Sequence, residues 1–295
     1  MVRALGAQHH MQGWLLGAVP PPMRALAGDT PWQHIPDATA SPDGEEPDLI
    51  IVLDTGAWSQ LKPISEWLSA RSDRVIGLDH HASGDDVAPA RVVDVCAASC
   101  TMVVLRLLDA LECEIDEQVA TPLFAGLATD TGWFRQANGN ADAFAVAARL
   151  LALGVDKDGV YRMLEETARS ARLALQACAL SSVRWLQDGR VAIMQLSQDD
   201  FDACDGRRSD VTGLVNAPLV VSGSEMACLL IEEPDGAIKA SFRSKPPATS
   251  GGPFIDVRQL AAQLDGGGHV HAAGATIEAS MTEAIETVTE VVSQC

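Results

Sequence analysis

A carboxylate and two imidazoles stand in a row at Asp79, His80 and His81, at the end of an apolar run. The run itself, residues 74–78, is short and partly β-branched, which predicts a buried strand of a parallel sheet. In open α/β sheets the carboxyl ends of such strands border the ligand crevice. Carboxylate oxygen and imidazole nitrogen both bind divalent metals, so the row is a candidate metal site. Since a triplet is short, these three residues alone leave a chance arrangement equally open.

Two aspartates elsewhere in the chain follow apolar runs in the same way. Asp54 follows residues 48–53 and Asp130 follows residues 123–128, each at the start of an Asp-Thr-Gly sequence. One Asp-Thr-Gly is also typical of a turn or a helix cap, where aspartate accepts from free backbone N–H groups. We interpret both aspartates as strand-end residues that meet residues 79–81 at one edge of the sheet. Three such clusters favour a metal site over three coincidental caps.

The segments around these residues predict an α/β first half. Between residues 48 and 153, strand-like and helix-like segments alternate, which is typical of βαβ units and a parallel sheet. Residues 1–45 show little pattern beyond a helix end at residues 1–6, and residues 36–47 predict a loop. We expect helices at residues 65–69, 99–111 and 141–153.

The second half predicts a smaller α/β domain. Residues 156–186 look helical nearly throughout, and a turn signal follows at residues 188–189. Residues 245–253 predict a flexible loop that precedes a short helix at residues 256–264. We expect strands at residues 191–196, 226–232 and 237–242.

A run of three glycines and a histidine follows that helix, at Gly266, Gly267, Gly268 and His269. Glycine lets backbone N–H groups approach a phosphate closely, and the histidine can donate to phosphate oxygens. Such a run alone is more often a loop than an anion site. Arg243, on the strand before it, adds a planar fork of donors and favours a phosphate site.

The composition limits the partners of the chain. It has 295 residues, of which 21 are basic and 40 are acidic, and a formal net charge of −19. Proteins that bind duplex DNA usually carry a basic footprint, so we exclude long duplex DNA as a partner. Short anionic substrates stay open, because metal ions and one or two arginines neutralise them locally.

The cysteines and the hydropathy pattern indicate a compartment. The 7 cysteines are scattered and none lies in a Cys-x-x-Cys motif, which is typical of reduced thiols in a cytosolic protein. No run of about 18 apolar residues predicts a membrane span, and the first residues lack a signal-peptide pattern. We therefore expect a cytoplasmic protein with no membrane partner.

The ordered set of these motifs resembles the DHH family of phosphoesterases, whose signature matches residues 79–81. The resemblance covers nearly the whole chain after residue 45, and by arrangement it is most similar to the bifunctional oligoribonuclease and pAp phosphatase subfamily. The matching motifs are residues 54–57, 79–81, 97–99, 129–135, 241–244 and 266–274.

The resemblance implies an α/β fold with two domains. Residues 1–168 would form a parallel-sheet, Rossmann-like DHH domain that is incomplete at its amino end. Residues 169–189 would form a helical linker, and residues 190–295 a smaller α/β substrate-binding domain of the DHH-associated type.

The resemblance also implies a pair of manganese ions and a role for each catalytic residue. Asp54 would bridge the ions, and His80 and Asp130 would complete one site. Asp79 would orient His80, and His81 would face the phosphate. The implied substrate-binding residues are His81, Arg243, Gly266, Gly267, Gly268 and His269.

The activity implied is metal-dependent hydrolysis of short oligoribonucleotides, of 3′-phosphoadenosine 5′-phosphate (pAp), or of both. A catalytically inactive nucleotide-binding or regulatory paralogue and a cyclic dinucleotide phosphodiesterase remain alternatives, and a homodimer stays open.

One motif of the family has no match in this chain. The family's first motif is a His-x-x-Pro-Asp-x-Asp pattern that supplies further metal ligands, and residues 1–48 contain no such pattern. We therefore expect weak metal binding, poor hydrolysis and one strand fewer in the first sheet. A start codon placed too far downstream and a degenerate paralogue both stay open as causes.

Overall fold

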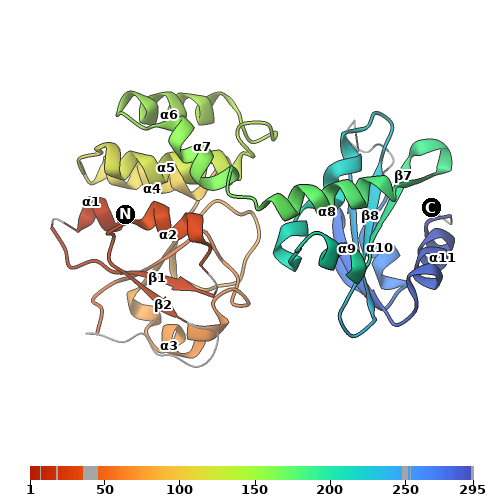
Figure 1. The fold of residues 1–295 in the computed structure, drawn as a ribbon. Helices are drawn as coiled ribbons and strands as arrows, with labels where there is room; N and C mark the ends of the chain where they lie inside the picture. The colour runs from red at the N-terminus through yellow and green to blue at the C-terminus, as the bar shows by residue number, and fades with distance from the viewer. Residues whose placement is uncertain (7, 18, 36–45, 248–251, 253, 294–295) are drawn as a thin grey trace. The chain divides into compact units, whose positions relative to one another are not determined.

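The computed structural model describes the whole chain except residues 7, 18, 36–45, 248–251, 253 and 294–295. The chain divides into two compact units, Met1–Thr167 and Ala168–Cys295 (Figure 1). The loops expected at residues 36–47 and 245–253 lie largely outside the described residues. No helix in the described part of the chain is long and apolar enough to cross a bilayer.

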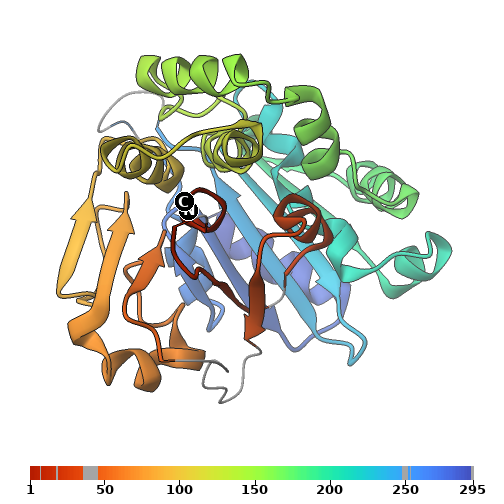
Figure 2. The same cartoon turned by 90° about the vertical axis from the view of Figure 1, so that its left-hand side faces the viewer.

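The first unit contains a three-stranded parallel sheet (Figure 2). Its strands are β3 (Ile50–Leu53), β4 (Val75–Asp79) and β5 (Ala90–Val93), with β4 in the middle. This confirms the expected α/β fold with a parallel sheet. One face of the sheet packs Leu78 against helices α4 (Cys100–Ala110) and α5 (Glu117–Asp130), and the other packs Val75 against Leu68.

The helices of the first unit follow the expected order, with ends set by capping residues. Asn140 and Asp156 accept backbone N–H groups at the starts of α6 and α7. The predicted helices at residues 65–69, 99–111 and 141–153 are confirmed to within two residues. The α-helices are α3 (Ser65–Ser69), α4 (Cys100–Ala110), α5 (Glu117–Asp130), α6 (Ala141–Ala152) and α7 (Lys157–Glu165).

The first part of the chain forms a second small sheet that its sequence pattern did not indicate. Strands β1 (Gly13–Leu16) and β2 (Trp32–Ile35) pair in parallel with each other. Two short helices, α1 (Val2–Leu5) and α2 (Pro21–Ala27), flank β1 along the chain. The expected helix end at residues 1–6 is confirmed as α1.

The expectation of a strand at residues 123–128 was wrong, because these residues lie inside α5. The helix begins where the Asp116 carboxylate accepts the backbone N–H of Val119 at 2.9 Å. From Val119 onward the buried apolar residues repeat every three or four positions, which a window of six residues does not reveal. Asp130 is therefore the last residue of a helix and not the end of a strand.

The second unit is built on a six-stranded mixed sheet, ordered β10-β11-β9-β8-β7-β6. Among these neighbours only β7 and β8 run parallel. The expected strands at residues 191–196, 226–232 and 237–242 are confirmed. The strands are β6 (Arg184–Leu186), β7 (Val191–Leu196), β8 (Met226–Glu232), β9 (Ile238–Ser244), β10 (Gly267–His269) and β11 (Ala272–Ile277).

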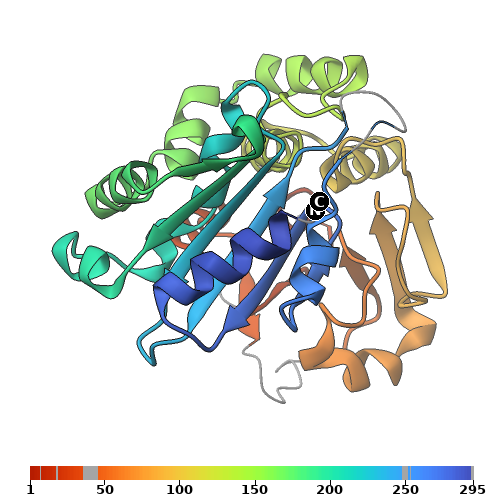
Figure 3. The ribbon, with the colours of Figure 1, turned by 90° about the vertical axis from the view of Figure 1, so that its right-hand side faces the viewer.

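Helices pack on both faces of this sheet. On one face, α10 (Val257–Ala262) and α11 (Met281–Val292) cover a core that reaches from β7 to β11 (Figure 3). On the other, α8 (Ser170–Ser181) and α9 (Gln198–Ala203) cover β7 and β8. Short 3-10 helices are η1 (Lys62–Ile64), η2 (Ser72–Arg74), η3 (Gln187–Gly189), η4 (Arg208–Val211) and η5 (Leu214–Val220).

The expectation of nearly continuous helix at residues 156–186 was wrong at its end. Residues 184–186 form β6, which pairs antiparallel with β7, so this part of the expected linker belongs to the second sheet. Hydrogen bonds to β7, which follows in the sequence, determine the strand conformation of residues 184–186.

Candidate metal centre

The two strand-end aspartates lie side by side because β3 and β4 are neighbours in register. Leu53 pairs with Leu78, and the backbone N–H of Asp54 donates to the Leu78 carbonyl at 3.0 Å. Asp54 then turns with a φ of 63°. Aspartate tolerates this left-handed conformation better than most residues do. The turn ends the strand and releases the Asp54 carboxylate at the carboxyl edge of the sheet.

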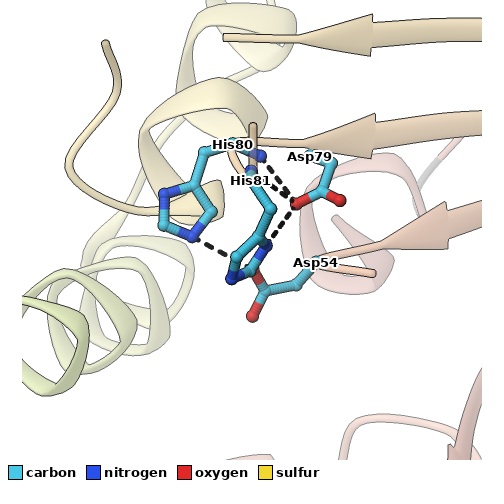
Figure 4. Close-up of side chains that lie close together, drawn as sticks. All are labelled: Asp54, Asp79, His80 and His81. Carbon is cyan, nitrogen blue, oxygen red and sulfur yellow. Dashed lines mark hydrogen bonds and ion pairs between the residues drawn. The ribbon is translucent and has the colours of Figure 1, made fainter. Parts of the chain in front are cut away.

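The His80 ring lies between two carboxylates. Its Nε2 atom is 3.4 Å from Asp54 Oδ1 and 3.7 Å from Asp130 Oδ2. The ring is largely buried, whereas the Asp54 side chain is about half exposed. The end of β3, the end of β4 and the last turn of α5 therefore bring together Asp54, His80 and Asp130, the three residues expected to bind metal. Figure 4 shows Asp54 and His80 of this group.

The sequence predicts that Asp79 orients the His80 ring, but in the structure Asp79 holds the His81 ring instead. Asp79 is buried, and its Oδ1 atom accepts from His81 Nδ1 at 2.7 Å and from the backbone N–H groups of His80 and His81 (Figure 4). The His80 ring instead has its Nδ1 atom 3.2 Å from the Ala97 carbonyl. That carbonyl fixes His80 with its Nε2 lone pair toward Asp54 and Asp130, the tautomer a metal ligand needs.

The hydrogen bonds of Asp79 set the charge of two residues. Burial opposes ionisation of Asp79, but the hydrogen bonds from His81 and His80 outweigh burial and lower its pKa. The hydrogen bond that His81 Nδ1 donates to the Asp79 carboxylate also raises the pKa of His81. Because Nδ1 of His81 is occupied, its Nε2 atom is the nitrogen left for a ligand, and the ring is 54% exposed.

The loop after α5 is built tightly around Asp130. Gly132, Trp133 and Phe134 all adopt positive φ, and the buried Thr131 hydroxyl donates to the Leu127 carbonyl at 2.7 Å. Asn138 Nδ2 donates to the backbone carbonyls of Asp130 at 3.1 Å and Ala98 at 3.0 Å.

Asn138 thus ties the loop that carries Asp130 to the loop whose Ala97 carbonyl holds His80. The sequence analysis missed Asn138, since an asparagine before Gly139 is typical of an ordinary turn.

The electrostatics of the site favour a bound cation. Burial raises the pKa of Asp54, and the neighbouring Asp130 carboxylate raises it further. Burial also raises the pKa of Asp130. Among the described residues, the salt-bridge partners of Asp54 and Asp130 are histidines only. A divalent cation would relieve the repulsion between these carboxylates, and oxygen and imidazole nitrogen are its usual ligands.

The tightest cluster also shows where a cation fits. One ligand atom from each of Asp54, Asp79, His80 and His81 lies within 4.8 Å of the others. A cavity of about 230 Å³ opens beside Asp79 and His81. Because Asp79 Oδ1 and His81 Nδ1 already bond to each other, the free ligand atoms of this cluster are those of Asp54 and His80 together with Nε2 of His81.

Apart from His81, the residues expected to bind phosphate lie together in the second unit. Arg243 on β9 pairs with Ala272 on β11, which pairs with His269 on β10, so the three side chains share one face of the sheet. The glycine run is not a loop throughout, since Gly267 and Gly268 begin β10.

The three glycines differ in whether a side chain would fit at their position. A Cβ on Gly266 would lie 2.2 Å from the Gly274 carbonyl oxygen, and one on Gly268 would lie 2.5 Å from the Ala272 carbonyl oxygen. A Cβ on Gly267 would meet nothing within 4 Å. Gly266 and Gly268 are therefore required by strand packing, whereas Gly267 leaves open space in front of the sheet.

These observations describe an α/β protein with a candidate divalent-metal centre at a sheet edge and, on a second sheet, a group of residues expected to bind phosphate. Comparison with known proteins agrees: residues 190–295 match the DHHA1 domain. The chain is 33% identical over 221 residues to the bifunctional oligoribonuclease and PAP phosphatase NrnA of Thermus thermophilus, covering 75% of this chain and 64% of that protein.

Two further similarities support the same assignment. The NrnA protein of Bacillus subtilis, which has the same name, is 25% identical over 232 residues, or 78% of this chain and 70% of that protein. The crystal structure of an exopolyphosphatase-related protein from Bacteroides fragilis is 28% identical, with a TM-score of 0.73 over 84% of this chain and 72% of that chain. These similarities support a DHH-family phosphoesterase of the NrnA subfamily, and the chain spans 64% of the length of the Thermus relative.

Proposed function

We propose that this chain is a phosphoesterase that acts on short oligoribonucleotides and on pAp. The observation that carries the proposal is the placement of His80 Nε2 within 4 Å of the carboxylates of both Asp54 and Asp130. The NrnA relatives, whose names include oligoribonuclease and PAP phosphatase, support this substrate class. Since the chain spans 64% of the Thermus relative, the activity of the whole protein stays part of the proposal.

We further propose manganese as the metal, held by Asp54, His80 and Asp130. When bound, a divalent cation shields the charge of a phosphate and lowers the pKa of a bound water molecule. The mixed oxygen and nitrogen ligand set suits manganese, although it also suits other first-row metals. Calorimetry with Mn²⁺ and Mg²⁺ separates these ions.

The chain's own residues orient the phosphate. His81, with its raised pKa and its Nδ1 fixed by Asp79, would donate from Nε2 to a phosphate oxygen. Asp79 stays ionised and holds that ring in place. In the second unit, Arg243, the backbone at Gly266, Gly267 and Gly268, and His269 would bind a phosphate of the substrate.

The number of ligands bears on how active the 295-residue polypeptide is. Beyond the bonded pair Asp79 and His81, the described residues at the site offer Asp54, His80 and Asp130 as ligands. Two ions need more than three protein ligands for tight binding, because ligand count and geometry set affinity. We therefore propose that this polypeptide binds metal weakly and hydrolyses its substrates slowly.

The same ligand count favours a second candidate, a nucleotide-binding protein with little or no hydrolysis. It would keep the phosphate site on β9 and β10 and use the metal centre for binding. For both candidates we propose a cytoplasmic location, which the free cysteines of the described chain support, and no binding of long duplex DNA. A homodimer remains part of the proposal.

One experiment tests both candidates. The purified 295-residue chain is incubated with pAp or a diadenylate, with Mn²⁺ or with EDTA, and released phosphate or mononucleotide is measured. Asp130→Asn is compared with Asp142→Asn, the same change at an exposed position of α6. Slow Mn²⁺-dependent turnover that Asp130→Asn abolishes and Asp142→Asn preserves supports the phosphoesterase. Binding without turnover supports the second candidate, and turnover in EDTA contradicts the metal centre.

A further inference from the structure

Two cysteines from different helices of the second unit lie side by side. Sγ of Cys178 is 3.9 Å from Sγ of Cys204, although the two residues are 26 positions apart in the chain. Cys178 lies on α8, and Cys204 is the residue that directly follows α9. Both are free thiols of intermediate accessibility, so a small molecule can reach them.

Both cysteines lie at the margin of the core under α8 and α9, which cover one side of the second sheet (Figure 1). Cys178 follows the fully buried Leu175 by three residues, and Cys204 follows the buried Phe201 by three residues. The other cysteine described in the interior of this unit, Cys228, is buried. Among the described cysteines of the unit, only the pair at the margin is therefore open to a small oxidant.

Hydrogen bonds hold α8 at both of its ends. Before the helix, Arg169 donates to the backbone carbonyl of Asp205, the residue after Cys204, at 2.9 Å. After the helix, the Ser182 hydroxyl donates to the Gln195 carbonyl of β7 at 3.1 Å and accepts the Gln195 N–H at 2.9 Å. The two sulfur atoms are therefore held close to each other by the surrounding structure, and little further ordering is needed when they react.

The separation of the two sulfur atoms suits a disulfide bond. The S–S length of a disulfide is about 2.05 Å, so the sulfurs of Cys178 and Cys204 need to approach each other by about 2 Å. Rotation of the two side chains covers a shift of this size. Because one residue lies on α8 and the other follows α9, the bond joins two helices and closes a loop that contains β6, β7 and α9.

We propose that Cys178 and Cys204 form a peroxide-sensitive pair whose disulfide bond joins α8 to the end of α9 and stabilises the second unit. One sulfur attacks an oxygen of hydrogen peroxide, the O–O bond breaks, one water leaves and a sulfenic acid remains. The other sulfur attacks the sulfenic sulfur and releases the second water. Two thiol hydrogens and two electrons pass to one peroxide molecule, and one S–S bond forms.

The surroundings of Cys178 make this reaction slow. Burial raises the pKa of Cys178, and its contacts with Cys204 and Asp200 raise that pKa further. Because the thiolate is the reactive form of cysteine, a raised pKa lowers the fraction that reacts at neutral pH. The pair therefore responds to sustained exposure to peroxide and stays reduced during a brief one.

The test compares the same folded chain before and after oxidation. The full 295-residue chain is treated with hydrogen peroxide, the remaining thiols are blocked with iodoacetamide, and the digested peptides are identified by mass spectrometry. Thermal unfolding is followed by calorimetry before oxidation, after oxidation and after dithiothreitol. Cys178→Ser and Cys204→Ser are compared with Cys113→Ser, which removes a cysteine of intermediate accessibility from the first unit.

We expect a peptide in which residues 178 and 204 are joined and which is two hydrogen masses lighter than the thiol forms. The bond should raise the midpoint of thermal unfolding of the second unit by about 5–10 °C, because it restricts the unfolded chain between the two cysteines. Dithiothreitol should reverse both changes. Cys113→Ser should behave like the unchanged chain, whereas Cys178→Ser and Cys204→Ser should show neither the joined peptide nor the shift.

Three results would overturn the proposal: the two sulfurs remain thiols or end as separate sulfinic acids, either cysteine pairs with a different cysteine, or the joined peptide forms without a rise in the midpoint. The comparison of the oxidised and reduced unchanged chain decides among these results even where a serine variant does not fold. No step needs the metal centre or a substrate, so the outcome is independent of the proposed function.

Discussion

Asp79 Oδ1 lies 2.7 Å from His81 Nδ1, so the acidic residue of the Asp-His-His signature holds the second histidine and not the first. The first histidine, His80, is held by the Ala97 carbonyl. The two rings therefore have separate supports, and their centroids are 4.4 Å apart. Damage to one support should leave the other ring in place.

Asp79→Asn should therefore impair substrate binding or turnover more than it impairs metal binding. The change removes the charge that raises the pKa of His81 and weakens the hold on its ring. We expect KM to rise about tenfold or kcat to fall by a similar factor, as for loss of a charge-assisted hydrogen bond. Mn²⁺ affinity by calorimetry should stay within about threefold, because the His80 ring keeps its Ala97 support. A large loss of Mn²⁺ affinity with unchanged KM would contradict the separate roles.

Asn138→Ala should loosen the metal centre. It removes the amide that links the Asp130 carbonyl to the Ala98 carbonyl and leaves both without that donor. We expect a loss of about 1–2 kcal/mol in the free energy of unfolding and a fall in Mn²⁺ affinity of about tenfold.

Asn140→Ala is the matched control for this change. Asn140 caps α6 by accepting from Ala143, and its loss also costs about 1 kcal/mol. It has no contact with the Asp130 carbonyl, so Mn²⁺ affinity should not change. If both variants lose metal affinity equally, general destabilisation explains the effect and Asn138 has no positioning role.

The sequence predicted the part of the metal centre that depends on local pattern. Apolar runs that end in Asp54 and Asp79 predicted two neighbouring strand ends, and β3 and β4 confirm both. Asp130 was predicted as a neighbour of these residues, but on a strand, because six apolar residues are compatible with either a strand or a buried helix. Its true position follows from the cap at Asp116, which lies seven residues before the apolar run that we used.

The parts that the sequence did not predict depend on contacts between distant segments. The Ala97 carbonyl and Asn138 act through the backbone or through one amide, and neither has a residue type that marks such a role. In the second unit, β11 pairs with β9 and β10 pairs with β11, so glycines that favour a turn locally form an edge strand. The sequence pattern therefore predicted β7, β8 and β9 in the middle of the second sheet better than β10 and β11 toward its edge.

Gly267→Ala and Gly268→Ala should have opposite consequences. At Gly267 the added methyl group meets no atom within 4 Å, so the protein should fold with unchanged stability while the methyl group obstructs the ligand. We expect affinity for pAp to fall several-fold. Gly268 has a φ of 143°, and its Cβ would lie 2.5 Å from the Ala272 carbonyl oxygen. That variant should lose about 1–3 kcal/mol of stability through backbone strain. Urea unfolding and calorimetry separate the two effects, and unchanged pAp binding by a folded Gly267→Ala protein would argue against a ligand at this glycine.

Two carboxylates share the guanidinium of Arg169, and they should differ in their contribution to stability. Asp210 is buried, lies 2.8 Å from Arg169 Nη1, and also accepts the backbone N–H of Arg207 at 2.9 Å. Asp205 lies 2.6 Å from Arg169 Nη2, but its side chain is 95% exposed. Asp210→Asn leaves a partly buried arginine with less compensation and should cost about 2–3 kcal/mol.

Asp205→Asn should cost less than about 1 kcal/mol, because water and salt screen an exposed pair. Urea unfolding of both variants at low and at high salt measures the difference. Since α8 begins immediately after Arg169, the loss in Asp210→Asn should appear as weaker hydrogen-exchange protection in α8 and η4, with α4 and α5 of the first unit unchanged. Equal costs for the two variants would show that burial of Asp210 does not strengthen its ion pair with Arg169.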